Sequence, residues 1–265
     1  MSHTLGYTVN CSLLFTELPL HERPRAAREA GFEAVEFWWP FASPIPPQDE
    51  VDGFVKALDR AGVRLTGLNF FAGELPGPDR GVLSHPARRD EFRANIDAVV
   101  RIAERTGTTG FNALYGLRQP GVDFDEQDRT ALENTLAAAR AVARVGGTVL
   151  VEPISGAESY PLKTAADGLA FVALAREAGA DNVALLADLY HLVVNGDDVA
   201  AVIRDHAAEF GHVQIADTPG RGEPGSGRLP IDTLLGAAQE AGYEGFVGLE
   251  YKPTVASEKS FGWLA

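Results

Sequence analysis

Short apolar segments alternate along the chain with longer segments in which apolar residues recur at helical spacing. The short segments are rich in Val, Leu and Phe, as expected of buried parallel strands, and eight such units can be counted. The expected strands are Leu5 to Asn10, Ala34 to Phe37, Arg64 to Phe70, Gly110 to Leu114, Thr148 to Val151, Val183 to Ala187, Gly211 to Gln214 and Phe246 to Leu249. We therefore predict an α/β fold, a single (β/α)8 barrel that forms one catalytic domain over residues 1–265.

Glycines follow the helical segments, at positions suited to the left-handed end of a helix. The predicted pairs of helix and glycine are Ala26 to Ala30 with Gly31, Val51 to Ala61 with Gly62, Pro86 to Thr106 with Gly107, Glu126 to Val145 with Gly146, and Phe171 to Ala178 with Gly179. An open doubly wound sheet is the alternative, but no glycine-rich dinucleotide motif follows the first strand. The glycine-rich segment 220–227 lacks the lysine of a phosphate-binding loop, and we interpret it as a mobile loop.

Composition narrows the classes of function. The formal net charge of -14 disfavours nucleic acids and anionic membranes, both of which reward clustered Lys and Arg. Cys11 is the only cysteine, which excludes an internal disulfide and a cysteine-based metal cluster. The first residues lack the pattern of a secretory signal, and no apolar stretch is long enough to span a membrane. We expect a cytoplasmic protein, and the sequence leaves a homo-oligomer open.

Four residues with oxygen ligands stand at the carboxyl ends of the later strands. They are Glu152, Asp188, Gln214 and Glu250. In a closed barrel these strand ends converge on one face, where active sites are found. Any one of them is more often a helix cap or a surface ion-pair partner, but three crowded carboxylates are unfavourable without a cation. The set therefore predicts a site for Mg2+ or Mn2+, which prefer hard oxygen donors.

Polar residues also end the first four expected strands, and two histidines stand near the later ones. The former are Asn10, Glu36, Asn69 and Asn112, to which we assign no catalytic role because Asn also favours turns. His191 follows its strand and can reach the cavity. His212 lies within its strand, where a structural histidine is expected.

Several motifs together resemble the hydroxypyruvate isomerase family of the xylose-isomerase-like TIM barrels, and the resemblance spans nearly the whole chain. They are Val151-Glu152-Pro153-Ile154, Asp188-Leu189-Tyr190-His191, His212-Val213-Gln214-Ile215-Ala216-Asp217, Arg221-Gly222-Glu223-Pro224-Gly225 and Leu249-Glu250-Tyr251-Lys252-Pro253. The resemblance implies that Glu152, Asp188, Gln214 and Glu250 bind one divalent ion. It further implies that Glu152 and Glu250 form the acid/base pair, and that His191 and Arg221 contact the substrate.

The reaction implied by this resemblance interconverts hydroxypyruvate and tartronate semialdehyde through an enediolate. The substrate would be a small anionic hydroxy-carbonyl acid. Arg221 is the preferred partner of its carboxylate, and Lys252 is a second candidate. Glu158 could hold a substrate hydroxyl, although a surface loop position is the alternative.

Other functions stay open at this stage. The nearest are isomerisation of a four-carbon 2-oxo-tetronate and 3-epimerisation of a ketose. A metal-dependent phosphodiesterase is disfavoured, because it needs several histidines and a basic face. A non-catalytic binding barrel is disfavoured by the presence of both Glu152 and Glu250.

Overall fold

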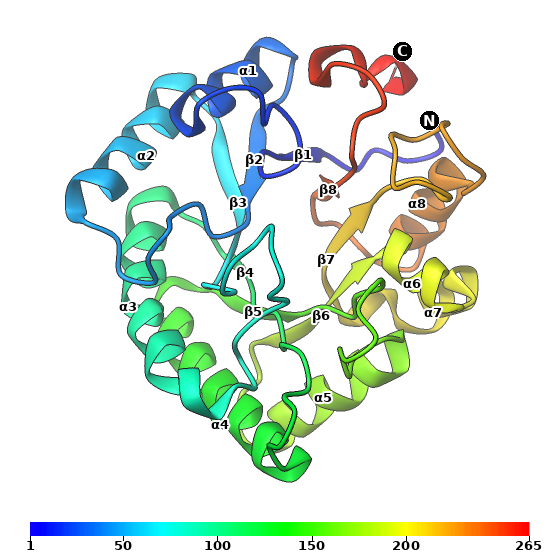
Figure 1. Cartoon of the computed structure of the whole chain (residues 1–265). Helices are drawn as coiled ribbons and strands as arrows, with labels where there is room; N and C mark the ends of the chain where they lie inside the picture. The colour runs from blue at the N-terminus through cyan, green and yellow to red at the C-terminus, as the bar shows by residue number, and fades with distance from the viewer. Residues whose placement is uncertain (265) are drawn as a thin grey trace.

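The chain folds as a closed parallel barrel surrounded by helices, as Figure 1 shows. The computed structural model describes residues 1–264. Its eight strands pair in chain order, and β1 pairs with β8 to close the barrel. The strands are β1 Tyr7–Asn10, β2 Ala34–Phe37, β3 Arg64–Asn69, β4 Gly110–Asn112, β5 Thr148–Val151, β6 Val183–Asp188, β7 Phe210–Ile215 and β8 Val247–Leu249. The predicted (β/α)8 barrel is confirmed.

Helices follow the strands and form the outer layer. They are α1 Arg23–Glu29, α2 Gln48–Ala61, α3 Arg89–Thr106, α4 Phe124–Val142, α5 Ala165–Glu177, α6 Leu189–Asn195, α7 Val199–His206 and α8 Ile231–Glu240. Gly62 and Gly107 end α2 and α3 in the left-handed conformation, with φ of 66° and 72°. The glycine pattern therefore located these two helix ends correctly.

Differences from the expected boundaries have local causes. β1 begins at Tyr7 rather than Leu5, because the Leu5 N–H donates to Nδ1 of His3 (3.2 Å) instead of joining the sheet. β4 ends at Asn112 rather than Leu114, and the chain beyond it forms an antiparallel bridge between Tyr115 and Gly81. The contact between Tyr115 and Gly81 joins segments far apart in the chain and is not visible in a local hydrophobic pattern.

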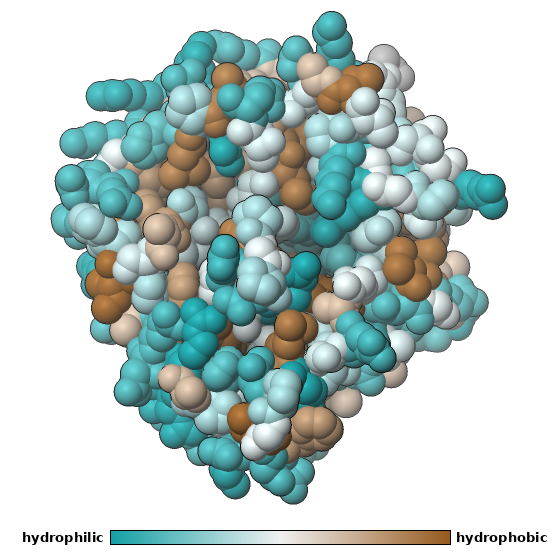
Figure 2. Space-filling model, viewed as in Figure 1, coloured by the Kyte–Doolittle hydropathy of each residue, from teal (hydrophilic) through white to brown (hydrophobic). Residues whose placement is uncertain are grey.

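The apolar core fills the space between the barrel and its helices. Phe54 of α2 is fully buried, and its ring packs edge-on against Phe37 of β2 with centroids 5.2 Å apart. In Figure 2 hydrophilic residues cover most of the face that carries the βα loops, with apolar residues in scattered groups. Among residues 1–264, no helix combines the length and the apolar character needed to span a membrane.

Phe54→Ala should lower the free energy of unfolding by about 3–5 kcal/mol, because it leaves a cavity between α2 and the barrel. Urea unfolding followed by circular dichroism measures this change. Phe124→Ala is the matched control, since Phe124 is 58% exposed and its loss should cost under about 1 kcal/mol. Equal losses for the two variants would contradict the assignment of Phe54 to the core.

Candidate active site and metal centre

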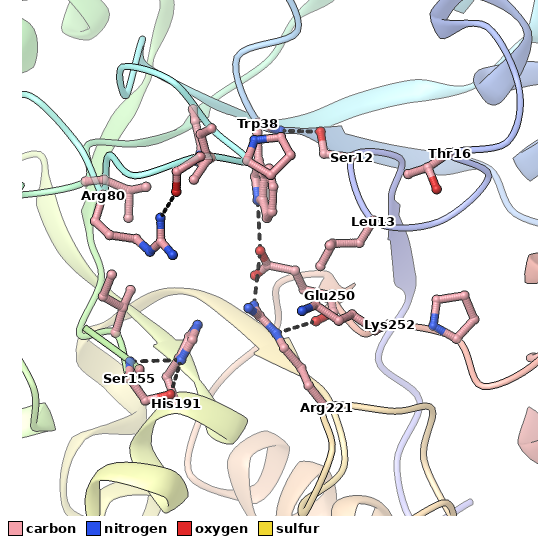
Figure 3. Close-up of a pocket in the computed structure, with 18 of the residues that line it drawn as sticks. Ser12, Leu13, Thr16, Trp38, Arg80, Ser155, His191, Arg221, Glu250 and Lys252 are labelled. Atoms are coloured by element: carbon pink, nitrogen blue, oxygen red, sulfur yellow. Dashed lines mark hydrogen bonds and ion pairs between the residues drawn. The ribbon is translucent and has the colours of Figure 1, made fainter. Parts of the chain in front are cut away.

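A cavity of about 710 Å³ opens above the carboxyl ends of the strands. Its wall includes residues from loops that follow β1, β2, β3, β5, β7 and β8, and Figure 3 shows these side chains converging. Glu152, His191, Arg221 and Glu250 lie on its floor and sides. Two of the polar strand ends that the sequence singled out, Glu152 and Glu250, therefore share one cavity.

The four predicted metal ligands are all buried at this end of the barrel. Glu152 follows β5, Asp188 is the last residue of β6, Gln214 lies in β7, and Glu250 follows β8. Their exposed fractions are 5%, 0%, 4% and 3% respectively. Burial raises the pKa of both Glu152 and Glu250 above the usual range, and the neighbouring carboxylates add to this effect, while Arg221 opposes it.

Asp188 acts both as a helix cap and as a member of the acidic cluster. Its Oδ1 accepts hydrogen bonds from the N–H groups of Tyr190 (2.9 Å) and His191 (3.4 Å) at the start of α6. Its Oδ2 faces inward, 3.5 Å from Nε2 of His191. The sequence analysis treated helix cap and site residue as alternatives for an acidic residue after a strand, and Asp188 has both positions at once.

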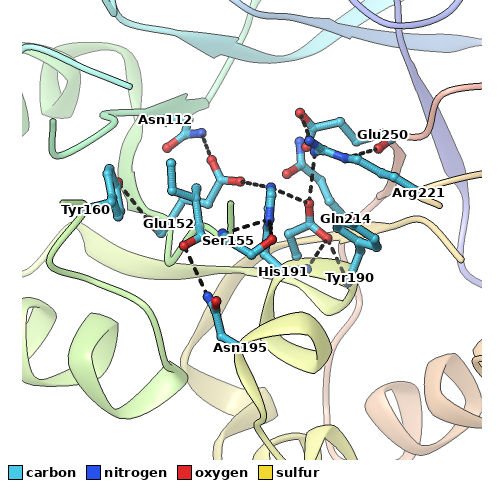
Figure 4. A network of polar contacts seen from close by, with 12 residues as sticks. Asn112, Glu152, Ser155, Tyr160, Tyr190, His191, Asn195, Gln214, Arg221 and Glu250 are labelled. Atoms are coloured by element: carbon cyan, nitrogen blue, oxygen red, sulfur yellow. Dashed lines mark hydrogen bonds and ion pairs between the residues drawn. The ribbon is translucent and has the colours of Figure 1, made fainter. Parts of the chain in front are cut away.

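His191 is held in one tautomer by the chain. The backbone N–H of Ser155 donates to its Nδ1 (3.0 Å), a contact drawn in Figure 4. Because Nδ1 accepts this bond, the neutral ring carries its proton on Nε2. Burial lowers the pKa of His191 to about 4, which keeps the ring neutral near pH 7. One possible ligand atom each from Glu152, Asp188 and His191 lies within 4.8 Å of the others, but a protonated Nε2 is a donor, not a metal ligand. Its position suits a hydrogen bond to a substrate oxygen.

Gln214 is oriented from beneath by Glu36 of β2. The Gln214 Nε2 donates to Glu36 Oε1 (2.7 Å), which also accepts from Asn10 (3.0 Å). Glu36 Oε2 lies 2.7 Å from Nε2 of His212, the histidine expected to be structural. With its nitrogen fixed in this way, the Gln214 Oε1 is buried and has no hydrogen-bond partner within residues 1–264.

Glu250 shows the same arrangement of one held and one free oxygen. Its Oε1 accepts from Nε1 of Trp38 (2.8 Å), and its Oε2 is buried without a partner in the described chain. Buried acceptors without donors are costly, and a cation would satisfy them. The free buried oxygens of Gln214 and Glu250, like the carboxylates of Glu152 and Asp188, are the oxygen donors that a divalent ion takes. Among the described residues, Glu250 lies outside the group formed by Glu152, Asp188 and His191, whose ligand atoms are within 4.8 Å of one another.

Arg221 lies between two of the carboxylates rather than free in the cavity. Its Nη2 is 3.4 Å from both Asp188 Oδ2 and Glu250 Oε1, and its guanidinium stacks on Tyr190. The Arg221 backbone has φ of 61°, a conformation rare for residues other than glycine. The structure therefore pairs Arg221 with the acidic cluster, and its contact with a substrate carboxylate stays a prediction.

The remaining candidates divide between the cavity rim and the surface. Lys252 lines the cavity but is exposed. Glu158 is exposed and does not line the cavity, although Ser155 and Gly156 of the same loop do. The prediction that Glu158 binds the substrate therefore finds no support in its position.

Three residues hold the predicted ligands in place, a role that was not assigned to them from the sequence. Asn112 donates to Glu152 Oε2 (2.6 Å), Trp38 holds Glu250, and Glu36 holds Gln214. The strand-end positions of Asn112 and Glu36 are visible in the sequence, but Asn at a strand end is also typical of turns.

Segment 220–227, interpreted as a mobile loop, is tied by its backbone N–H groups to the carboxylate of Asp217.

Glu36→Gln should weaken Mn2+ binding about 10- to 100-fold, because the new amide lets Gln214 turn its oxygen away from the site. Calorimetric titration of the protein with Mn2+ measures this change, and thermal unfolding checks that the barrel persists. The matched control is Glu158→Gln on the exposed loop, which should bind Mn2+ as the original protein does. Unchanged affinity in Glu36→Gln would show that Glu36 does not orient a metal ligand.

Comparison with known proteins gives one consistent result. Residues 24–265 match the family described as "Xylose isomerase-like TIM barrel". A Streptomyces coelicolor protein named "Putative hydroxypyruvate isomerase" is 56% identical over 264 residues, covering 97% of this chain and 95% of that protein. A 2-oxo-tetronate isomerase from Cupriavidus necator is 32% identical, with 97% and 96% covered.

A solved structure has the same architecture. It is named as an AP endonuclease, family 2, from Brucella melitensis; its TM-score is 0.88 and its identity 31%, with 98% of each chain covered. The sequence and the fold agree with the motifs that meet in the cavity. The chain belongs to the hydroxypyruvate isomerase family, a family of isomerase enzymes within the xylose isomerase-like TIM barrels.

Proposed function

We propose that this protein is a divalent-metal-dependent isomerase that interconverts hydroxypyruvate and tartronate semialdehyde. The observation that supports it most is the pair of buried glutamates, Glu152 and Glu250, which line one cavity and each have one oxygen held by a neutral donor. Two carboxylates in one cavity can accept and return a proton. The relative from Streptomyces coelicolor carries the corresponding name.

The chemistry requires a proton to move between two adjacent carbons. Hydroxypyruvate has a ketone beside a hydroxymethyl group, whereas tartronate semialdehyde has an aldehyde beside a secondary alcohol. Removal of the C–H proton from either gives the same enediolate. A base near one carbon and a proton donor near the other therefore suffice, provided that the developing oxyanion is stabilised.

Glu152 and Glu250 are suited to carry this proton. Burial raises the pKa of each in the chain without a cation, and a bound divalent cation would lower it again, so that each glutamate is ionised and can accept a proton. Asn112 fixes the orientation of Glu152, and Trp38 fixes that of Glu250, each through one hydrogen bond.

The other groups of the site act on the substrate oxygens. His191 is neutral and presents its Nε2–H to the cavity, where it would donate to the carbonyl or hydroxyl oxygen of the substrate. Mg2+ or Mn2+, held by Glu152, Asp188, Gln214 and Glu250, would polarise the carbonyl and stabilise negative charge when bound. Arg221 would balance the charge of the carboxylates beside it.

A four-carbon 2-oxo-tetronate is the second candidate substrate. It has the same carboxylate, ketone and adjacent hydroxyl, and differs by one further hydroxymethyl group. The cavity of about 710 Å³ falls in the range of pockets for ligands larger than a three-carbon acid. The Cupriavidus necator relative bears that name.

An endonuclease fits this cavity less well, despite the name of the Brucella melitensis protein. Among the residues that line the described cavity, His191 is the one histidine, and the chain carries a net charge of -14. A DNA phosphodiesterase needs cations along a broad face. We propose a small anionic substrate in the cytoplasm and no nucleic-acid or membrane partner.

A substrate panel after removal of metal tests the proposed function. Hydroxypyruvate should be converted with Mn2+ or Mg2+, and exhaustive chelation should abolish turnover while circular dichroism shows the barrel intact, since its apolar core is far larger than one ion site. The panel includes a 2-oxo-tetronate and a neutral ketose. Activity that survives chelation and dialysis would refute the metal mechanism. Turnover of the ketose alone would indicate an epimerisation in place of the proposed reaction.

Glu250→Gln should lower kcat by about two to four powers of ten even at saturating Mn2+, the range typical for loss of general acid-base catalysis. The variant keeps the size of the side chain and one oxygen donor. Glu258→Gln, an exposed change in the same C-terminal segment, serves as control and should keep the original rate. Full recovery of Glu250→Gln at high Mn2+ would mean that Glu250 is a ligand only. Exchange of solvent deuterium into recovered substrate would report whether Glu152 still forms the enediolate.

A further inference from the structure

Three cationic side chains line the cavity, and they differ in what they contact. Arg221 is paired with Asp188 and Glu250, and Lys252 is exposed at the rim. Arg80, from the loop after β3, is half-buried and points into the cavity (Figure 3). Within residues 1–264, no carboxylate oxygen lies within 4.0 Å of its nitrogens, so Arg80 carries an unneutralised charge beside the site.

The guanidinium of Arg80 is hydrogen-bonded to the chain through Nη1 only, among the residues that the structure describes. Its Nη1 donates to the carbonyl oxygens of Gly77 and Asp79, both at 2.6 Å. The Nε and Nη2 atoms, which share the other edge, have no hydrogen-bond acceptor in the described part of the chain. Two parallel N–H groups on one edge match the two oxygens of a carboxylate.

The loop holds Arg80 in place before any ligand binds. Asp79 Oδ2 accepts from the N–H of Glu74 (2.8 Å) and pairs with Nη1 of Arg88 (2.9 Å). The next residue, Gly81, has φ of 106°, and a Cβ there would clash with the carbonyl oxygen of Leu114. This tight approach fixes the backbone beside Arg80, so little conformational entropy would be lost on binding.

Charge decides where an acid substrate can place its carboxylate. Glu152, Asp188 and Glu250 crowd one end of the cavity and repel a further carboxylate. The carbonyl and hydroxyl oxygens belong beside that cluster, and the carboxylate belongs away from it. Arg80 and His191 line the same cavity, so one small molecule can contact both of them.

We propose that Arg80, rather than Arg221, binds the substrate carboxylate through Nε and Nη2 and so selects 2-oxo and 2-hydroxy acids over neutral sugars. The inference builds on the proposed function, since it names the group that reads the acid end of that substrate. It holds equally for hydroxypyruvate and for a 2-oxo-tetronate, which share this end.

Two measurements on Arg80→Gln and Arg80→Lys test the proposal. The first is calorimetric binding of glycerate, an unreactive 2-hydroxy acid, in the presence of Mn2+. Arg80→Gln should weaken the binding of glycerate about 10- to 100-fold, as expected for loss of a charge-assisted pair. Arg80→Lys keeps the charge and should lose less of this affinity. The second compares kcat/KM for hydroxypyruvate and for dihydroxyacetone, which carries a hydroxymethyl group in place of the carboxylate. The preference for the acid should fall by a similar factor.

Asp79→Asn is the matched control, because it disturbs the same loop and leaves the cavity cation in place. It should affect the acid and the neutral substrate alike. The proposal is overturned if Arg80→Gln binds glycerate as the original protein does, if it lowers both kcat/KM values equally, or if Asp79→Asn reproduces the loss specific to the acid. Failure of the original protein to bind glycerate would also overturn it.

The two hypotheses fail in different ways. Arg80-dependent binding of glycerate without turnover of either substrate would refute the isomerase and support the carboxylate site. Turnover of hydroxypyruvate that does not depend on Arg80 would support the isomerase and refute the carboxylate site at Arg80.

Discussion

Burial of several carboxylates at the mouth of an apolar barrel is the constraint on which the site depends. Closure of the barrel brings the ends of β5, β6 and β8 together and with them Glu152, Asp188 and Glu250, all nearly inaccessible to water. Ionised carboxylates lose hydration there and repel one another. Arg221 offsets part of this charge at 3.4 Å, and the remaining free oxygens favour a divalent cation.

The side chains around this cluster share one design. In each proposed ligand one polar atom is held by the protein and the other is left toward the centre. Asn112 holds Glu152, the N-terminus of α6 holds Asp188, and Trp38 holds Glu250. Gln214 is held through its nitrogen by Glu36. Ligands fixed in this way need not reorganise when an ion or a charged transition state forms, which is the advantage of a preorganised site.

The sequence was most informative where a local pattern determines the structure. Apolar segments located the eight strands to within about two residues, and glycines located the ends of α2 and α3, since both features are set by near neighbours along the chain. Strand ends indicated the acidic cluster because a barrel must bring them together. The role of Trp38 was beyond sequence reasoning, because it lies 212 residues from Glu250 and their contact depends on side-chain direction across the closed barrel. Glu158 shows the converse limit: its proximity to Glu152 in sequence did not bring it to the cavity.

The net charge of -14 raises the question of how the protein could accept an anion at all. Salt screens charges at the surface over about 8 Å at physiological ionic strength, so most of this charge is not felt inside the cavity. Affinity there is set by Arg80, Arg221 and Lys252 against the three carboxylates. Because Arg221 is committed to those carboxylates, the cavity is divided into an acidic end that suits a cation and a basic side that suits an anion. A small molecule with an acid group at one end and a hydroxy-carbonyl pair at the other has that same polarity, and under the proposed function this match would orient it for proton transfer.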